Sequence, residues 1–195
     1  MQTTKIKLNK IAKIITGLPI QRYIDTQNAI EQKIISNISL DNIDNDFEIE
    51  KECISEDIKE QFYSKEHDIL VKVQQQIFAK EITTETNAII PNTYTIIRVK
   101  DTNKVNPTFL SHYINNPVVK YEILRQVDST RIIKINTAIL KDLTVYLPNK
   151  EEQDNYAKTI TKINKRIKIK KKSIKSDEEL IDALLDNIIG DNYAD

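Results

Sequence analysis

Apolar residues in the last quarter of the chain recur at alternating steps of four and three residues, the repeat of a coiled-coil helix. Its start is marked by Asn149, which can cap a helix, and by Glu152 three residues later, as in a capping box. Ten positions make up the repeat, and eight of them are apolar. The ten dimerisation positions are Tyr156, Ile160, Ile163, Ile167, Lys170, Ile174, Asp177, Ile181, Leu184 and Ile188. We predict one helix over residues 149–189, about 60 Å long, that pairs with another helix.

Two other arrangements of this segment stay open. The helix could pack along its own domain, although a strip this long and narrow would outrun a domain of about 150 residues. It could also break near Ser173 and fold back, because Ser176 with Glu179 forms a second capping box before an apolar run. The unbroken repeat through Ile174 favours the continuous helix.

The first 148 residues alternate between short strand-like runs and short helical runs. Two helices begin at Asn106-Pro107 and Asn116-Pro117, since asparagine caps a helix and proline fits its first position. Runs rich in Val, Ile or Tyr predict strands at residues 5–8, 68–73, 93–100, 131–135 and 143–147. The predicted class is α+β: a domain over residues 1–148, a long helix over 149–190, and a tail over 191–195.

Charge is balanced over the whole chain but sorted along it, with 29 Lys+Arg against 29 Asp+Glu. In the long helix, residues 158–175 hold nine bases and no acid, and residues 177–195 hold seven acids and no base. Two parallel copies would oppose like charges, whereas in antiparallel copies each basic half faces an acidic half. Antiparallel pairing about Ile174 also brings Lys170 near Asp177 or Glu178 of the other copy. The pattern predicts an antiparallel homodimer.

Composition excludes several kinds of chemistry. Two glycines cannot form a glycine-rich phosphate-binding or dinucleotide-binding loop. One cysteine and two histidines exclude an internal disulfide and argue against a structural metal. We expect Cys53 to be a half-buried apolar residue. Neither a signal peptide nor a membrane span is evident, so we expect a cytoplasmic protein without membrane contact.

Three sets of residues only superficially resemble catalytic sites. Residues 106–109 (NPTF) resemble the NPP(F/Y) loop of amino-methyltransferases, but the second proline is missing and the helix start already explains Asn-Pro. Asp25 with residues 31–33 (EQK) has the residue types of a metal nuclease, but the local sequence is not convincingly a strand. His67 and His112 have no nucleophile motif nearby. We expect a non-catalytic protein with no cofactor and no metal.

Five motifs follow one another along the chain. They are residues 7–17 (KLNKIAKIITG), 67–71 (HDILV), 105–117 (VNPTFLSHYINNP), 129–148 (STRIIKINTAILKDLTVYLP) and 151–153 (EEQ). In this order they resemble the specificity subunit of type I restriction–modification enzymes. The family's motifs read "KLGDIAxIxxG", "GDIL", "NPxFL…YLNSP", "GST…I…L…DL…IPLP" and "EEQ". The resemblance covers most of the chain and rests on the ordered set, because no single motif is specific.

The resemblance implies a fold, a function and partners. The family's usual chain carries two target-recognition domains and two long helices that pack antiparallel, and this sequence has one of each. It therefore looks like a half-subunit that homodimerises, reads an inverted bipartite site in double-stranded DNA, and docks adenine methyltransferase subunits and, through them, a restriction subunit. The family's specificity subunit does no chemistry itself.

The resemblance also places DNA contacts in two expected recognition loops. Glutamine amides read adenine edges and the arginine fork reads guanine, while the other side chains suit phosphates or bases. The expected contacts are Gln74, Gln75, Gln76, Ser129, Thr130, Arg131, Lys134 and Asn136.

The sequence departs from the family at these loops. Asp128 stands where the family has glycine, and residues 74–76 (QQQ) replace a glycine-rich turn. Residues 41–60 hold nine carboxylates and two lysines, which suits a solvated or protein-docking face better than a duplex. A second function therefore stays open: an interaction protein, a decoy or a remnant, that captures methyltransferase subunits through the helix without binding DNA.

Overall fold

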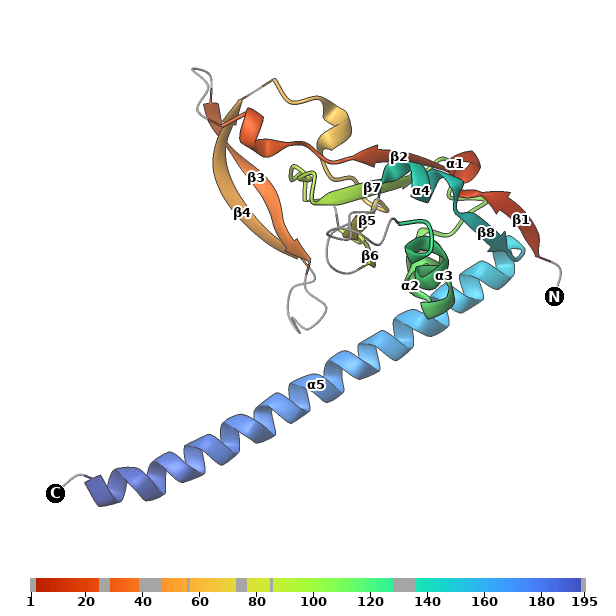
Figure 1. The fold of residues 1–195 in the computed structure, drawn as a ribbon. Helices are drawn as coiled ribbons and strands as arrows, with labels where there is room; N and C mark the ends of the chain where they lie inside the picture. Colours follow the sequence, from red (N-terminus) through yellow and green to blue (C-terminus); the bar gives the residue numbers. More distant parts are fainter. Residues whose placement is uncertain are drawn as a thin grey trace.

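The structure is a computed structural model, and it describes residues 3–24, 29–38, 47–55, 57–72, 77–84, 86–127 and 136–193. For residues 187–193 the description is limited to the backbone. Residues 3–149 contain short strands and helices and are called the body below. One long helix follows the body and projects away from it (Figure 1). The predicted class, α+β with a long C-terminal helix, is confirmed.

A four-stranded antiparallel sheet lies at the centre of the body. Its order is β2 (Ala12–Thr16), β7 (Tyr94–Val99), β5 (Ile69–Lys72) and β6 (Phe78–Glu81). Ile69 and Val71 join the apolar cluster on one face, whereas Leu70 joins the cluster on the other. Burial on both faces explains why β5 is an uninterrupted apolar run in the sequence. The strands predicted at 68–73 and 93–100 are confirmed as β5 and β7.

Helices α2 (Pro107–Asn115), α3 (Pro117–Leu124) and α4 (Thr137–Asp142) contribute to the first of these clusters. The two predicted Asn-Pro starts are confirmed. The side-chain oxygen of Asn106 accepts a hydrogen bond from the Phe109 N–H, and that of Asn116 accepts one from the Val118 N–H. Proline occupies the first turn of both helices, where its missing N–H removes no helical bond.

A long hairpin of β3 (Ala29–Ile38) and β4 (Phe47–Ser55) flanks the sheet (Figure 1). Ile35 and Ile38 pack in the cluster of Leu70, while Ile34 and Ile54 pack in a third cluster. The expectation that residues 31–33 do not form a strand was wrong, because they lie within β3. The described acidic residues of β4 are exposed, as the charge pattern predicts.

The chain's start meets the end of the body. Strand β1 (Thr4–Lys7) pairs antiparallel with β8 (Thr144–Leu147), and α1 (Leu8–Ile11) packs near α4. The strands predicted at 5–8 and 143–147 are thereby confirmed within one residue, while the one predicted at 131–135 lies outside the described residues. Short 3-10 turns at Ile20–Arg22 and Glu60–Phe62 complete the body.

Helix α5 (Lys150–Tyr193) is continuous, so the predicted long helix is confirmed and the fold-back near Ser173 does not occur. Its predicted cap is present, since the side-chain oxygen of Asn149 accepts a hydrogen bond from the Glu152 N–H. At 44 residues, α5 is about 66 Å long. Over the described residues, no helix is both long and apolar enough to cross a membrane.

Candidate nucleic-acid interface

Seven of the eight predicted DNA contacts lie outside the described residues: Gln74, Gln75, Gln76, Ser129, Thr130, Arg131 and Lys134. The eighth, Asn136, is the N-cap of α4, and its side-chain oxygen accepts from the Ala138 N–H at 3.0 Å. Asn136 is exposed and directly follows residues 128–135 in the sequence. The structure therefore describes the scaffold that carries the expected contacts.

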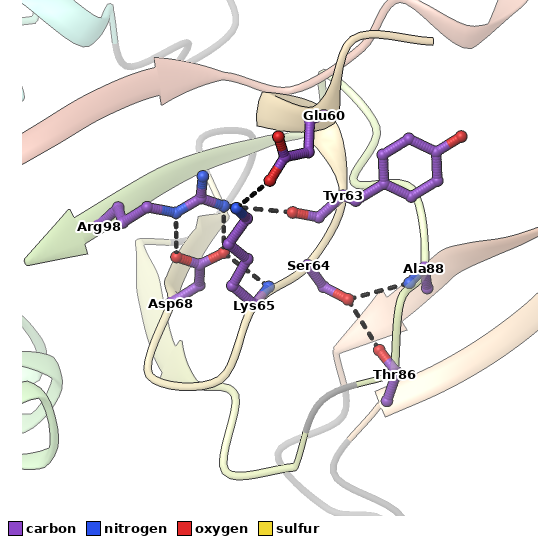
Figure 2. A network of polar contacts seen from close by, with 8 residues as sticks. All are labelled: Glu60, Tyr63, Ser64, Lys65, Asp68, Thr86, Ala88 and Arg98. Atoms are coloured by element: carbon purple, nitrogen blue, oxygen red, sulfur yellow. Dashed lines mark hydrogen bonds and ion pairs between the residues drawn. The ribbon is translucent and has the colours of Figure 1, made fainter.

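A buried ion pair fixes the start of β5, the strand that leads into residues 73–76. Asp68 is fully buried and accepts from Arg98 Nε at 2.7 Å and from Arg98 Nη2 at 2.6 Å (Figure 2). The backbone N–H of Lys65 also donates to Asp68 at 2.9 Å, and Arg98 Nη2 donates to the Tyr63 carbonyl at 3.2 Å. The hydrogen bonds that Arg98 donates to Asp68 raise the pKa of Arg98. Two parallel bonds hold the carboxylate in one orientation, so β5 is tied to both β7 and the segment before it.

The residue before Asp68 adopts an unusual backbone conformation. His67 has φ of 68°, in the left-handed region that favours glycine. Its Nδ1 lies 2.9 Å from Oε1 of the buried Glu81 on β6, and Thr108 on α2 donates to the other carboxylate oxygen at 2.6 Å. Glu81 therefore joins the turn before β5 to the end of β6 and to helix α2.

The outer edge of β6 is covered by a side-chain amide. Asn115 at the end of α2 accepts from the Ala79 N–H at 2.9 Å and donates to the Ala79 carbonyl at 2.6 Å. This pair of bonds replaces the neighbouring strand that β6 lacks on this side. Both strands that flank residues 73–76 are thus held by β7 and by α2.

Helix α5 is joined to the body by a junction between its first turns and the start of α2. Gln153 is 1% exposed; its oxygen accepts from the Asn106 N–H at 3.0 Å, and its nitrogen donates to the carbonyls of Lys104 and Pro148. Asn106 Nδ2 also donates to Asp154 at 2.7 Å, and the hydrogen bonds from Lys150 and Asn106 lower the pKa of Asp154. We call Asn106, Gln153 and Asp154 the α2–α5 junction.

Beyond this junction, α5 keeps two further contacts with α2. The rings of Phe109 and Tyr156 have centroids 6.3 Å apart. Asn164 Nδ2 lies 3.3 Å from Nε2 of His112, and because an amide nitrogen only donates, the imidazole nitrogen accepts. Burial, followed by the charge of Lys80, lowers the pKa of His112. Within the described residues, the last of these contacts lies at Asn164, about one third of the way along α5.

The predicted dimerisation positions are exposed along most of α5. Tyr156, Ile163 and Ile167 are between 43% and 47% exposed, and Ile174, Ile181 and Leu184 are between 55% and 57% exposed. Ile160 is half-buried, Lys170 and Asp177 are exposed, and the side chain of Ile188 lies outside the described part. From Ile163 to Leu184, the described apolar positions of the repeat therefore form an exposed stripe that Lys170 and Asp177 interrupt.

Comparison with known proteins identifies this arrangement. No protein-family model matches the sequence, and a search of curated proteins finds no match. Among solved structures, the HsdS subunit from Thermoanaerobacter tengcongensis superposes with a TM-score of 0.66 at 10% identity, over 95% of this chain and 48% of that one. The type I restriction–modification S subunit from M. genitalium gives 0.63 at 16% identity, over 94% and 44%. This chain has the S-subunit fold.

A third structure, which addresses complex assembly and conformational transition of the type I restriction–modification system, contains a chain with the same fold. It superposes with a TM-score of 0.66 at 16% identity, over 93% of this chain and 43% of that one. The chain therefore spans about half the length of the S-subunit structures that it matches.

The S-subunit motifs now have physical roles in this chain. His67 occupies the left-handed position where the resembled motif has glycine, and Asp68 of the same motif anchors Arg98. The motifs at 105–117 and 151–153 meet in the α2–α5 junction through Asn106 and Gln153. Gly17 is the last residue of the first motif. An added Cβ at this position would lie 2.1 Å from the Pro91 carbonyl oxygen. Sequence reasoning missed these long-range roles, although each residue stood in a recognised motif.

The residues that resemble catalytic sites have other partners. Within the described part of the chain, His, Cys, Asp and Glu form no group of three that could hold a metal. Glu31 forms an exposed ion pair with Lys51 at 2.6 Å, and Asp25 lies outside the described residues. The expectation that Cys53 is half-buried was wrong, because β4 presents it to solvent. Asn106 and Pro107 serve as the start of α2.

Proposed function

We propose that this chain is a half-size, non-catalytic specificity subunit of a type I restriction–modification system. It recognises a DNA sequence, pairs with a second copy through α5, and docks methyltransferase subunits. The observation that carries the proposal is the fold match, which spans 95% of this chain but 48% of the HsdS subunit from Thermoanaerobacter tengcongensis. One body and one helix correspond to about half of such a subunit, so two copies supply a whole one.

The surface of α5 supports pairing with a second copy. Its exposed stripe runs through Ile163, Ile174 and Ile181, and burying an isoleucine side chain contributes about 1.5–3 kcal/mol. Antiparallel copies centred on Ile174 set the basic stretch 158–175 of each chain against the acidic stretch 177–195 of the other. Such an arrangement covers the apolar stripe and neutralises both charged halves.

Two copies related by a two-fold axis would read two identical half-sites in inverted orientation. In each copy we assign the contacts to residues that follow β5 or precede α4 in the sequence. They are Gln74, Gln75, Gln76, Ser129, Thr130, Arg131, Lys134 and Asn136. Residues 98–150 hold nine bases and four acids, so this part of the body carries the excess positive charge that phosphates require.

Sedimentation equilibrium at micromolar concentration tests the pairing. We expect a species of twice the 22.6 kDa chain mass, and a monomer at this concentration would contradict the homodimer.

Selection from a duplex library with inverted half-sites and variable spacers, at ~50 mM salt, tests recognition. The selection is run with and without an adenine methyltransferase subunit. We expect one half-site sequence to be enriched in inverted repeat. Capture of the methyltransferase without enrichment of any sequence would contradict DNA recognition and identify a decoy.

Single substitutions test the assigned contacts. If Arg131 reads a base, Arg131→Ala costs about 1–3 kcal/mol of binding and relaxes one position of the site, whereas Lys134→Ala at a phosphate weakens all sequences alike. Asn136→Asp keeps the cap, because aspartate caps as well as asparagine. A folded Asn136→Asp protein that binds DNA like the wild type would exclude Asn136 from the interface.

A further inference from the structure

The α2–α5 junction has properties that apolar packing alone would not require. Gln153 is almost fully buried, yet its amide makes three hydrogen bonds to the chain at residues 104, 106 and 148. These partners belong to the two connections that precede α2 and α5. A planar amide satisfies all three only when the two helix starts have one relative orientation.

The contacts next to Gln153 further restrict the orientation of α5 relative to α2. Asp154, on the next position of α5, accepts from Asn106 Nδ2, while the oxygen of the same Asn106 side chain caps α2. The side chain of Asn106 thus bonds to both helices, to α2 through its oxygen and to α5 through its nitrogen. Ala157 and the Phe109–Tyr156 ring contact supply apolar packing beside it, but apolar contacts are non-directional and allow one helix to slide or rotate on the other.

We propose that Gln153 is a positioning residue that sets the angle between the body and α5, and thereby the spacing at which a paired molecule reads its two half-sites. The angle between the body and α5 is a property of the single chain. Only its consequence for the spacing on DNA rests on the proposed function. Gln153 acts through its hydrogen bonds to residues 104, 106 and 148, and at 1% exposure it offers no surface to a duplex.

A small change in the angle at the junction moves the distal part of α5 by a large distance. Ala183 is 30 residues beyond Gln153, which along a helix is about 45 Å. A rotation of about 10° at the junction displaces Ala183 relative to the body by about 8 Å, while one base-pair step is about 3.4 Å. A small change at the junction therefore corresponds to about two base pairs of spacing.

Distance measurement between two spin labels tests the angle directly. Cys53 is the chain's one cysteine and is exposed on β4, so it carries the first label; Ala183→Cys, exposed and off the apolar stripe of α5, carries the second. Labelled protein is mixed with an excess of unlabelled Cys53→Ser chain, so that distances within one chain dominate. The reference protein should give one narrow distance distribution.

Gln153→Met keeps the side-chain volume and removes all three hydrogen bonds. We expect its mean distance to shift by several ångströms or its distribution to broaden by a similar amount. The matched control is Gln126→Leu, which replaces an exposed glutamine at the end of α3 and should keep the reference distribution. If Gln153→Met does not fold, Asp154→Ala carries the test, with a smaller shift in the same measurement. A folded variant at Gln153, or failing that at Asp154, with the reference distribution would overturn the inference.

The consequence for DNA is measured by spacer selection on the inverted library. Gln153→Met should enrich a different or wider set of spacers than the reference, with the same half-site sequence. A reference protein that enriches no site contradicts the proposed function, and the label distances then still decide the role of Gln153. A shifted distance with an unchanged spacer preference would overturn the link between the angle and the spacing.

Discussion

The body and the distal half of α5 use isoleucine in opposite ways. Ile54, Ile69 and Ile97 of the body are fully buried, whereas Ile174 and Ile181 of α5 are each 57% exposed. The body completes its own core from strands and helices that meet over long sequence separations. In α5, the last contact with the body that the structure describes is that between Asn164 and His112, and the described apolar residues from Ile167 to Leu185 are exposed. The difference indicates that the body is stabilised within one chain, and it supports the proposed pairing of α5 with a second helix.

Ile174→Asp should have a larger effect than any other substitution considered, because it changes the centre of the proposed helix pair. In an antiparallel pair centred on Ile174, the two copies of Ile174 face each other, so Ile174→Asp removes two buried side chains and opposes two charges. The loss is about 3–6 kcal/mol, which weakens pairing by more than about 100-fold. Sedimentation equilibrium should then find a monomer, while the thermal midpoint of the body stays close to that of the wild-type monomer.

Ile169→Asp is the control for this experiment. Ile169 is 59% exposed, close to the 57% of Ile174, but it lies off the repeat of four and three residues. It should leave the dimer intact. Equal weakening by Ile169→Asp and Ile174→Asp would contradict the assigned seam.

Within the body, the buried Asp68–Arg98 ion pair should contribute strongly to stability. Asp68→Ala leaves Arg98 half-buried without its carboxylate and leaves the Lys65 N–H without an acceptor. We expect a loss of about 3 kcal/mol in the free energy of unfolding, measured by urea denaturation. Glu60→Ala removes the exposed ion pair to Lys65 and should leave the midpoint unchanged. A similar midpoint for both variants would mean that the buried pair does not anchor β5.

A smaller loss of stability is expected at Gly17, where two backbone segments are in close contact. An added Cβ at Gly17 would lie 2.1 Å from the carbonyl oxygen of Pro91, so Gly17→Ala must separate two backbone segments joined by the hydrogen bond from Leu18 to Ile90. We expect a cost of about 2 kcal/mol in unfolding. Thr16→Ala, at the exposed neighbouring residue, is the control. Wild-type stability in Gly17→Ala would show that the two backbone segments can separate without cost.

These sites also show how far the sequence predicts the structure. Helix starts at Asn106 and Asn116 and the continuity of α5 are local properties, fixed by residues within one or two turns, and all were predicted correctly. The hairpin β3–β4 was missed because its register shifts between Ile35 and Asn37, and the two ends of the hairpin bury opposite faces. A strand with that irregularity has no regular alternation of apolar and polar residues.

The candidate site was predictable only in part, for a related reason. The resemblance pointed to Asp68, Asn106 and Gln153 as motif residues, but their partners lie 30 to 48 residues away in sequence. No pattern along the chain records such pairs. A buried polar residue inside a motif is the signal that could have indicated them, since burial requires hydrogen-bond partners from elsewhere in the fold.

The smallest expected effect concerns the boundary between the two regions. Burial and the charge of Lys80 lower the pKa of His112, and its neutral Nε2 accepts from Asn164 of α5. The unfolded chain therefore binds this proton first as pH falls below about 6.5, so the folded state loses stability from there down through its own lower pKa. Protonation also replaces the acceptor at Nε2 by a donor that faces the amide of Asn164. Thermal midpoints measured from pH 7 to pH 5 should fall less steeply for His112→Gln than for the wild type. Parallel curves for the two proteins would mean that His112 does not couple the body to α5 through its protonation.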